Sequence, residues 1–232
     1  MKQIEIFPTI KDGLSIALVN YLSLVAAAAL YILTIWIPYL NVGTTIAMSS
    51  LPAEMAKGEV INPLFIFNGK YRKNMGEFLI LMSLMGGAIF CGFLFGIIPG
   101  IVISIAWSFA VVLFVDKDLN ALEALRESNR ITYGNKWRIF CTEFLVVIAL
   151  EIAVAIINAL FGIGEVTWLE AIGSIIILVL LIFAVPALYG VEASIYKQLT
   201  APVAPEAPEV PAAAPAADPA PAAKPAAPKA EE

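Results

Sequence analysis

The sequence predicts an all-α membrane protein. We expect a polytopic transmembrane helix bundle of about six spans in three hairpins, with interfacial amphipathic helices and a disordered Pro/Ala-rich C-terminal tail. The chain has 232 residues, of which 60% are hydrophobic and only 14% are charged, whereas soluble domains contain about 25% charged residues. Its apolar residues gather in long runs, several of them near the roughly 20 residues that cross a bilayer. Its basic residues fall in the segments between these runs.

The apolar runs define the spans and their direction. In chain order the predicted spans are 14–36, 39–56, 77–96, 100–115, 139–160 and 169–193. The second is short and polar, and the sequence leaves open whether it crosses fully. Six spans with both termini inside put every Lys and Arg of the body on one face, and basic residues near span ends favour the cytoplasmic side. We therefore expect a multi-pass protein of the inner or plasma membrane with cytoplasmic termini.

The composition divides the chain into a transmembrane domain, residues 1–198, and an acidic tail, residues 199–232. Prolines every three or four residues disfavour a helix in the tail, and little apolar bulk remains there to fold. Between 200 and 232 the tail holds five acids and two lysines. Two interpretations stay open for it: a solubilising arm, or a tether for membrane or cytoplasmic protein partners.

Two kinds of segment are predicted at the inner interface. Residues 119–132 show an amphipathic pattern, with a stripe of Leu119, Leu122 and Leu125, so we expect a helix that lies flat in the interface. A pattern of Lys, aromatic residue, Arg, four residues, Glu and Phe also occurs twice, 66 residues apart, starting at Lys70 and at Lys136. It predicts that the membrane domain is built from a repeated unit.

Cations beside interfacial rings suit anionic lipid headgroups, although simple anchoring of the topology explains such residues equally well. The candidate residues at the headgroup level are Lys70, Tyr71, Arg72, Lys73, Arg126, Arg130, Lys136, Trp137 and Arg138.

Residues 97–144 carry a recognisable set of motifs. They contain Pro99-Gly100, the acids Asp116 and Asp118, and then Ala124-Leu125, Ser128 and Gly134. This stretch resembles a group of bacterial integral membrane proteins related to the membrane domain of glycerophosphoryl diester phosphodiesterase. The resemblance implies a helical membrane fold. It implies no catalysis, because the chain carries no phosphodiesterase domain.

Five polar side chains inside the predicted spans are candidates for a function. Glu151 lies near the middle of the fifth span, where a carboxylate costs roughly 2.5–3.5 kcal/mol on insertion scales, and Asn158 follows on nearly the same helix face. Glu151 is interpreted either as a proton- or cation-coupled site or as a neutral group bonded to a neighbouring helix. Glu143, Glu192 and Asn20 come from three spans at similar depth and predict a shared polar layer.

Three glycines, Gly92, Gly96 and Gly100, form a small-residue stripe suited to close helix packing. The stripe predicts either contact between the third and fourth spans or a homodimer face, and the oligomeric state stays open.

The sequence offers no pattern for catalysis. It contains no histidine, and Cys91 and Cys141 both fall within apolar runs, which indicates neither a disulfide nor a metal site. We expect no enzyme activity, no cofactor, no metal and no nucleic-acid partner. The favoured hypothesis is a non-catalytic membrane scaffold or accessory subunit that interacts with membrane lipids and partner proteins. The alternative is a small transporter or channel with Glu151 in a polar path.

Overall fold

The computed structural model describes residues 3–58, 60–161 and 167–201, so most of the predicted tail lies outside it. The described chain is helical and contains no strand, and its residues through Ala201 belong to one compact unit. Five stretches are long and apolar enough to cross a membrane: Ile6–Thr34, Met75–Phe95, Ile97–Asp116, Lys136–Phe161 and Trp168–Thr200. These coincide with five of the six predicted spans and confirm an all-α protein with several potential transmembrane helices.

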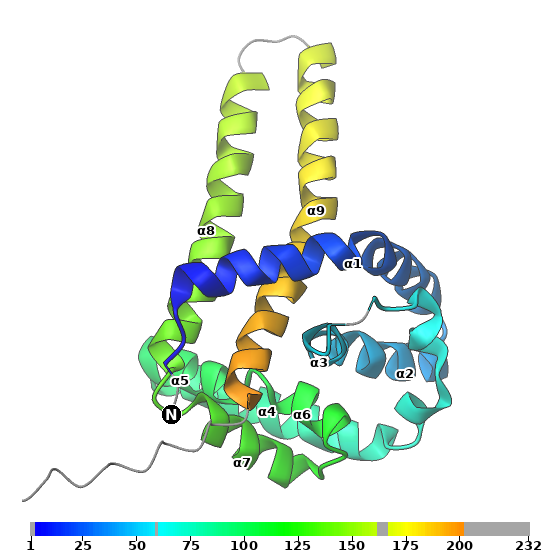
Figure 1. The fold of residues 1–232 in the computed structure, drawn as a ribbon, viewed down its shortest axis with the longest axis vertical. Coiled ribbons are helices and arrows are strands. Elements are labelled where there is room, and N and C mark those ends of the chain that lie inside the picture. Colours follow the sequence, from blue (N-terminus) through cyan, green and yellow to red (C-terminus); the bar gives the residue numbers. More distant parts are fainter. Residues whose placement is uncertain (1–2, 59, 162–166, 202–232) are drawn as a thin grey trace, which may run out of the picture. The chain divides into compact units, whose positions relative to one another are not determined.

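The last two helices, α8 (Lys136–Phe161) and α9 (Thr167–Thr200), form a long hairpin that stands out from the other helices (Figure 1). The most apolar 18-residue stretch of α8 contains no buried residue. An exposed apolar surface of this size is typical of a face that contacts lipid or another protein.

Helix α1 (Ile6–Thr34) runs across α9 in Figure 1, and two glycines allow the crossing. A Cβ atom at Gly190 would collide with the carbonyl oxygen of Gly13, and one at Gly13 would lie 2.5 Å from the Cα of Val191. The rings of Tyr21 and Phe183 stack beside this point, with centroids 4.4 Å apart. The sequence predicted a polar layer shared by the first, fifth and last spans but not this glycine contact, because close backbone approach between distant segments leaves no local pattern.

The predicted second span, 39–56, is not one helix. It forms α2 (Pro38–Ser49) and α3 (Leu51–Ala56), and neither is among the five potential spans. This segment is the most buried part of the chain, and its hydroxyls bond inside the protein: Thr44 lies 3.1 Å from the Thr34 hydroxyl. Its low hydropathy is explained by this position, since a segment covered by protein does not need an apolar surface.

Two short 3₁₀ helices, η1 (Pro63–Phe67) and η2 (Gly69–Arg72), lead into a hairpin of α4 (Met75–Phe95) and α5 (Ile97–Trp107). Gly96 has a φ of +148°, which favours glycine, and turns the chain between the two helices. A Cβ at Gly92 would lie 3.1 Å from the Cα of Gly100. Two of the three predicted packing glycines therefore seat α4 against α5.

The chain then continues through α6 (Ala110–Asp116) into α7 (Ala121–Thr132). Asn120 and Glu123 form a capping box that starts α7, as a helix at 119–132 requires. Of the predicted apolar stripe, Leu125 is buried within the protein and Leu122 is 56% exposed. The buried face of α7 consists of Ala121, Ala124, Leu125, Ser128, Ile131 and Thr132.

Candidate functional site

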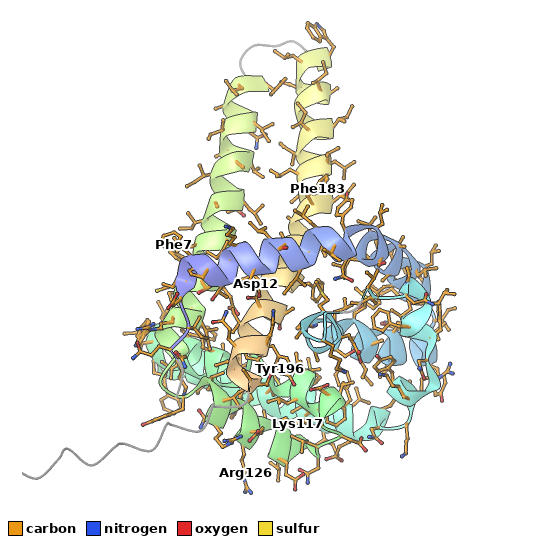
Figure 2. The ribbon with its side chains drawn as sticks, viewed as in Figure 1. Phe7, Asp12, Lys117, Arg126, Phe183 and Tyr196 are labelled. Carbon is orange, nitrogen blue, oxygen red and sulfur yellow. The ribbon has the colours of Figure 1, made fainter. Side chains whose placement is uncertain are left out.

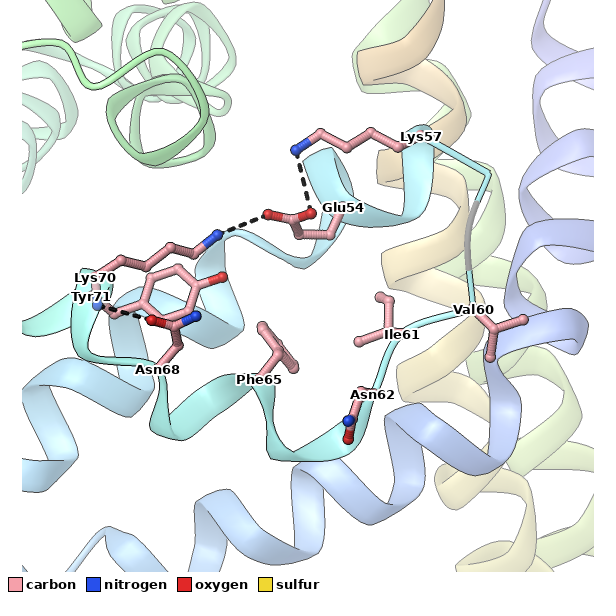
Figure 3. A pocket seen from close by; sticks show the side chains of 9 residues that line it. All are labelled: Glu54, Lys57, Val60, Ile61, Asn62, Phe65, Asn68, Lys70 and Tyr71. Carbon is pink, nitrogen blue, oxygen red and sulfur yellow. Dashed lines mark hydrogen bonds and ion pairs between the residues drawn. The ribbon is translucent and has the colours of Figure 1, made fainter.

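Three groups of charged side chains on the described chain are candidates for a binding site, and the first is a network of ion pairs. Figure 3 shows Glu54 between two lysines, 3.2 Å from the Nζ atoms of Lys57 and Lys70. Lys57 also lies 3.2 Å from Asp116, which accepts a 2.6 Å hydrogen bond from the hydroxyl of Tyr196. The network thus joins η2, α3, α6 and α9.

The pocket beside this network has a volume of about 280 Å³ and is lined by Lys57 and Lys70 together with Glu54. Partial burial disfavours the charge of Lys57, but the carboxylates of Asp116 and Glu54 outweigh this effect and raise its pKa above the usual value. Both lysines are neutralised within the chain. The pocket therefore has little net attraction for an anion, and we interpret the network as structural.

The second group lies along α7. Glu127 accepts hydrogen bonds from Arg130 at 2.6 Å and from Lys117 at 2.8 Å, and these hold the pKa of Glu127 at about 2. Arg126 lines the same pocket of about 300 Å³. Figure 2 places Lys117 and Arg126 at the end of the described chain opposite the tip of the α8–α9 hairpin. Glu123 and Glu127 in its lining offset most of its positive charge.

The third group, at the start of α8, differs in having no acid. A pocket of about 340 Å³ is lined on the α5 side by Ile101, Val102 and Ile105. The α8 side is lined by Tyr133, Gly134, Lys136, Trp137 and Arg138. Its walls combine an apolar surface, two exposed rings and two cations, and we call it the basic pocket.

Both cations of the basic pocket bond to neutral groups. Arg138 donates 2.8 Å and 2.5 Å hydrogen bonds to the Ile4 carbonyl oxygen and the Gln3 side-chain oxygen. Lys136 donates to the Asn129 side-chain oxygen at 2.8 Å. Within residues 3–58, 60–161 and 167–201, neither forms an ion pair with a carboxylate.

The position of these cations on α8 adds to their attraction for an anion. They occupy the first turn of a 26-residue helix, and this turn holds no acidic residue. The amino end of a helix carries a partial positive charge, so cations there are unfavourable and an anion is favourable. The partial positive charge of the helix end and the charges of the two side chains therefore both favour a bound anion.

The two copies of the predicted repeat have different surroundings. Tyr71 is 3% exposed and accepts a hydrogen bond from Ser50, whereas Trp137 is 64% exposed. Glu77 accepts a 2.9 Å hydrogen bond from the backbone of Ala121, whereas Glu143 has no comparable bond among the described residues. Of the other predicted headgroup residues, Arg72 packs its side chain against α2 and Lys73 lines a pocket with Asp118.

The predicted polar residues of the spans have different surroundings. Glu151 and Asn158 lie on the exposed surface of α8 and have no hydrogen bond within the described chain. Asn20 is buried, donating to the Ile16 carbonyl oxygen and accepting a 3.0 Å hydrogen bond from the Ile61 backbone N–H. Glu143 and Glu192 lie close enough to interact electrostatically. Two of the three residues of the predicted layer therefore lie near each other.

Sequence reasoning missed the apolar wall of the basic pocket. The turn at 97–100 was expected on the face opposite the cations, yet Ile101 and Val102 share a pocket with Lys136 and Arg138. Periodicity within α5 does not indicate which residues of α8 share a pocket with it, because that depends on how the α4–α5 hairpin lies against α8.

Comparison with known proteins identifies no relative: no family model, curated protein or solved structure matches the chain. Within the described residues, no group of three or more acid or cysteine side chains is arranged to hold a metal ion.

Proposed function

We propose that this chain is a non-catalytic integral membrane protein, a scaffold or accessory subunit that recruits anionic phospholipid to the basic pocket. Its setting is the inner or plasma membrane, with both termini cytoplasmic. The relationship to the membrane domain of glycerophosphoryl diester phosphodiesterase is part of this proposal.

One observation supports the proposal above the others: Lys136 and Arg138 share a pocket without an acid. A lipid phosphate placed there meets two cations and the amino end of α8, while its acyl chains meet Ile101 and Val102. Trp137 and Tyr133 have exposed rings of the kind found at the headgroup level. The other basic pockets each contain acidic side chains that compete with a phosphate.

The alternative, a small transporter or channel that uses Glu151, has weaker support. The Glu151 side chain lies on the exposed surface of α8. A coupled transport site needs a polar path between helices.

The proposal is tested by lipid selectivity. The full chain, purified in detergent, is incubated with phosphatidylglycerol or phosphatidylcholine, and native mass spectrometry measures the bound fraction of each. We expect a clear preference for phosphatidylglycerol. Replacing Lys136→Gln and Arg138→Gln together should reduce that preference by roughly 30-fold, because each cation near an anionic surface contributes about 1 kcal/mol.

The matched control is Lys11→Gln with Lys73→Gln, which removes the same charge from two cations that do not share a pocket. This pair should leave at least half of the preference. An equal loss in both double variants would show a general effect of charge and contradict a defined site.

A further inference from the structure

The outer face of α8 carries a regular stripe that no described part of the chain covers. Phe144 and Ile148 are 48% and 37% exposed, and Glu151, Ala155 and Asn158 are exposed as well. Their spacing alternates between four and three residues. This is the spacing at which one helix packs along another in a left-handed pair.

The stripe is separate from the contact between α8 and α9. The less exposed residues of the same segment are Leu150, Ala153, Val154 and Ile157, which define a different side of the helix. Phe144, the first residue of the stripe, is stacked on Phe140, with ring centroids 5.4 Å apart. This contact fixes the orientation of the Phe144 ring.

The polar members of the stripe specify what covers it. Glu151 and Asn158 have no partner within the described chain, and exposed carboxyl and amide groups in hydrocarbon are expensive. Their partner must therefore bring hydrogen-bonding groups to the same two depths, one heptad apart. A purely apolar helix or lipid would leave both groups unsatisfied.

We propose that the partner is a second copy of this chain, packed through the same stripe about a two-fold axis along the membrane normal. Two copies inserted in the same direction are parallel, so Glu151 meets Glu151 and Asn158 meets Asn158. A carboxyl group that carries its proton donates one hydrogen bond and accepts another, and an amide does the same, so each group is its own complement. Ala155, between them, lets the two backbones approach closely.

Disulfide crosslinking in native membranes tests this geometry with the full chain. In a background with Cys91→Ser and Cys141→Ala, Ala155→Cys should form an oxidant-dependent dimer at twice the chain mass of 24.9 kDa. Ile156→Cys is the matched control: Ile156 is 53% exposed at the same depth, but about 140° from Glu151 around the helix. It should give little dimer.

A second measurement tests the role of the polar pair. Glu151→Leu with Asn158→Leu should weaken association by roughly tenfold, since both interhelical hydrogen bonds are lost. Glu151→Gln keeps a group that both donates and accepts, and should retain most of the dimer.

Three results would overturn the proposal: no dimer at Ala155→Cys, equal crosslinking at Ala155→Cys and Ile156→Cys, or capture of a different protein by Ala155→Cys. None of them bears on the lipid preference of the basic pocket, so the two proposals fail separately.

Discussion

At the scale of single residues, the backbone contact between Gly13 and Gly190 determines how α1 crosses α9. The two helices approach so closely there that neither position has room for a methyl group. Ser194 donates a 2.9 Å hydrogen bond to Asp12 one turn away, and Gln198 donates to the Thr9 hydroxyl. These bonds form only where the two backbones are close.

Gly190→Ala should therefore destabilise the protein. The added methyl group would overlap the Gly13 carbonyl oxygen and Ala17, and overpacking of this kind costs about 1–3 kcal/mol. Thermal unfolding of the purified chain in one detergent would measure the loss. Gly87→Ala is the control, because its added methyl group meets open space. Equal stability of the two variants would show that α1 and α9 do not touch at this point.

Residue types in the sequence identified several of the important positions but not their environments. Glu151 could be located in a span, yet the face of α8 on which it lies depends on where α9 packs. Tyr71 and Trp137 occupy equivalent places in the repeat, but only Tyr71 is buried, because η1 and α2 cover it. Local pattern indicates which side chains are polar or aromatic, whereas tertiary contacts decide which of them are accessible.

At the scale of elements, α7 shows how an amphipathic helix is held at the end of the body. Its buried face includes two hydroxyls. Ser128 donates a 2.9 Å hydrogen bond to the Ala106 carbonyl oxygen, and Thr132 donates to the same oxygen. Its outer side is joined to α6 through Glu127 and Lys117. The amphipathic pattern predicted a helix at 119–132, but the small residues on its buried face could not be recognised as a packing surface from hydropathy.

The stability of α7 should depend on pH through Glu127. Its pKa falls from 4.5 to about 2 on folding, so its contribution is complete above pH 4.5 and disappears as the pH falls toward 2. Arg130 and Lys117 are 69% and 40% exposed, which limits the effect to roughly 0.2–1 kcal/mol. Hydrogen exchange of α7 in wild type and Glu127→Gln should differ at pH 6 and converge near pH 2.5. A difference that grows on acidification would contradict this assignment.

At the scale of the whole described unit, the helices do not share one direction. Figure 1 shows α8 and α9 upright and α1 lying across them. Ile101, Val102 and Ile105 of α5 also share a pocket with the first turn of α8. Hydropathy identified five of the six predicted spans, but it contains no information on their mutual angles. The start of α5, expected on the face opposite the cations, therefore lies elsewhere than predicted.

Spin-label distances would distinguish these arrangements. Labels at Ile98 and Tyr133, both exposed, should lie well under the roughly 30 Å thickness of the hydrocarbon core. A bundle with the turn on the far face would separate them by at least that thickness. Labels at Tyr133 and Trp168 serve as the control. The 26 residues of α8 rise about 39 Å at 1.5 Å per residue, so this pair should be far apart in either case.

The length of the free part of α9 has a consequence for the surrounding bilayer. Packing against the body begins at Phe183, whose ring stacks on Tyr21 of α1, so within the described chain the stretch from Thr167 to Ile182 has only α8 beside it. At about 1.5 Å per residue it rises about 25 Å, which is less than the roughly 30 Å of an average hydrocarbon core. Such a mismatch is relieved by local thinning of the lipid or by sinking of the body toward the acyl chains. The protein should therefore prefer thin membranes and compress thick ones around it.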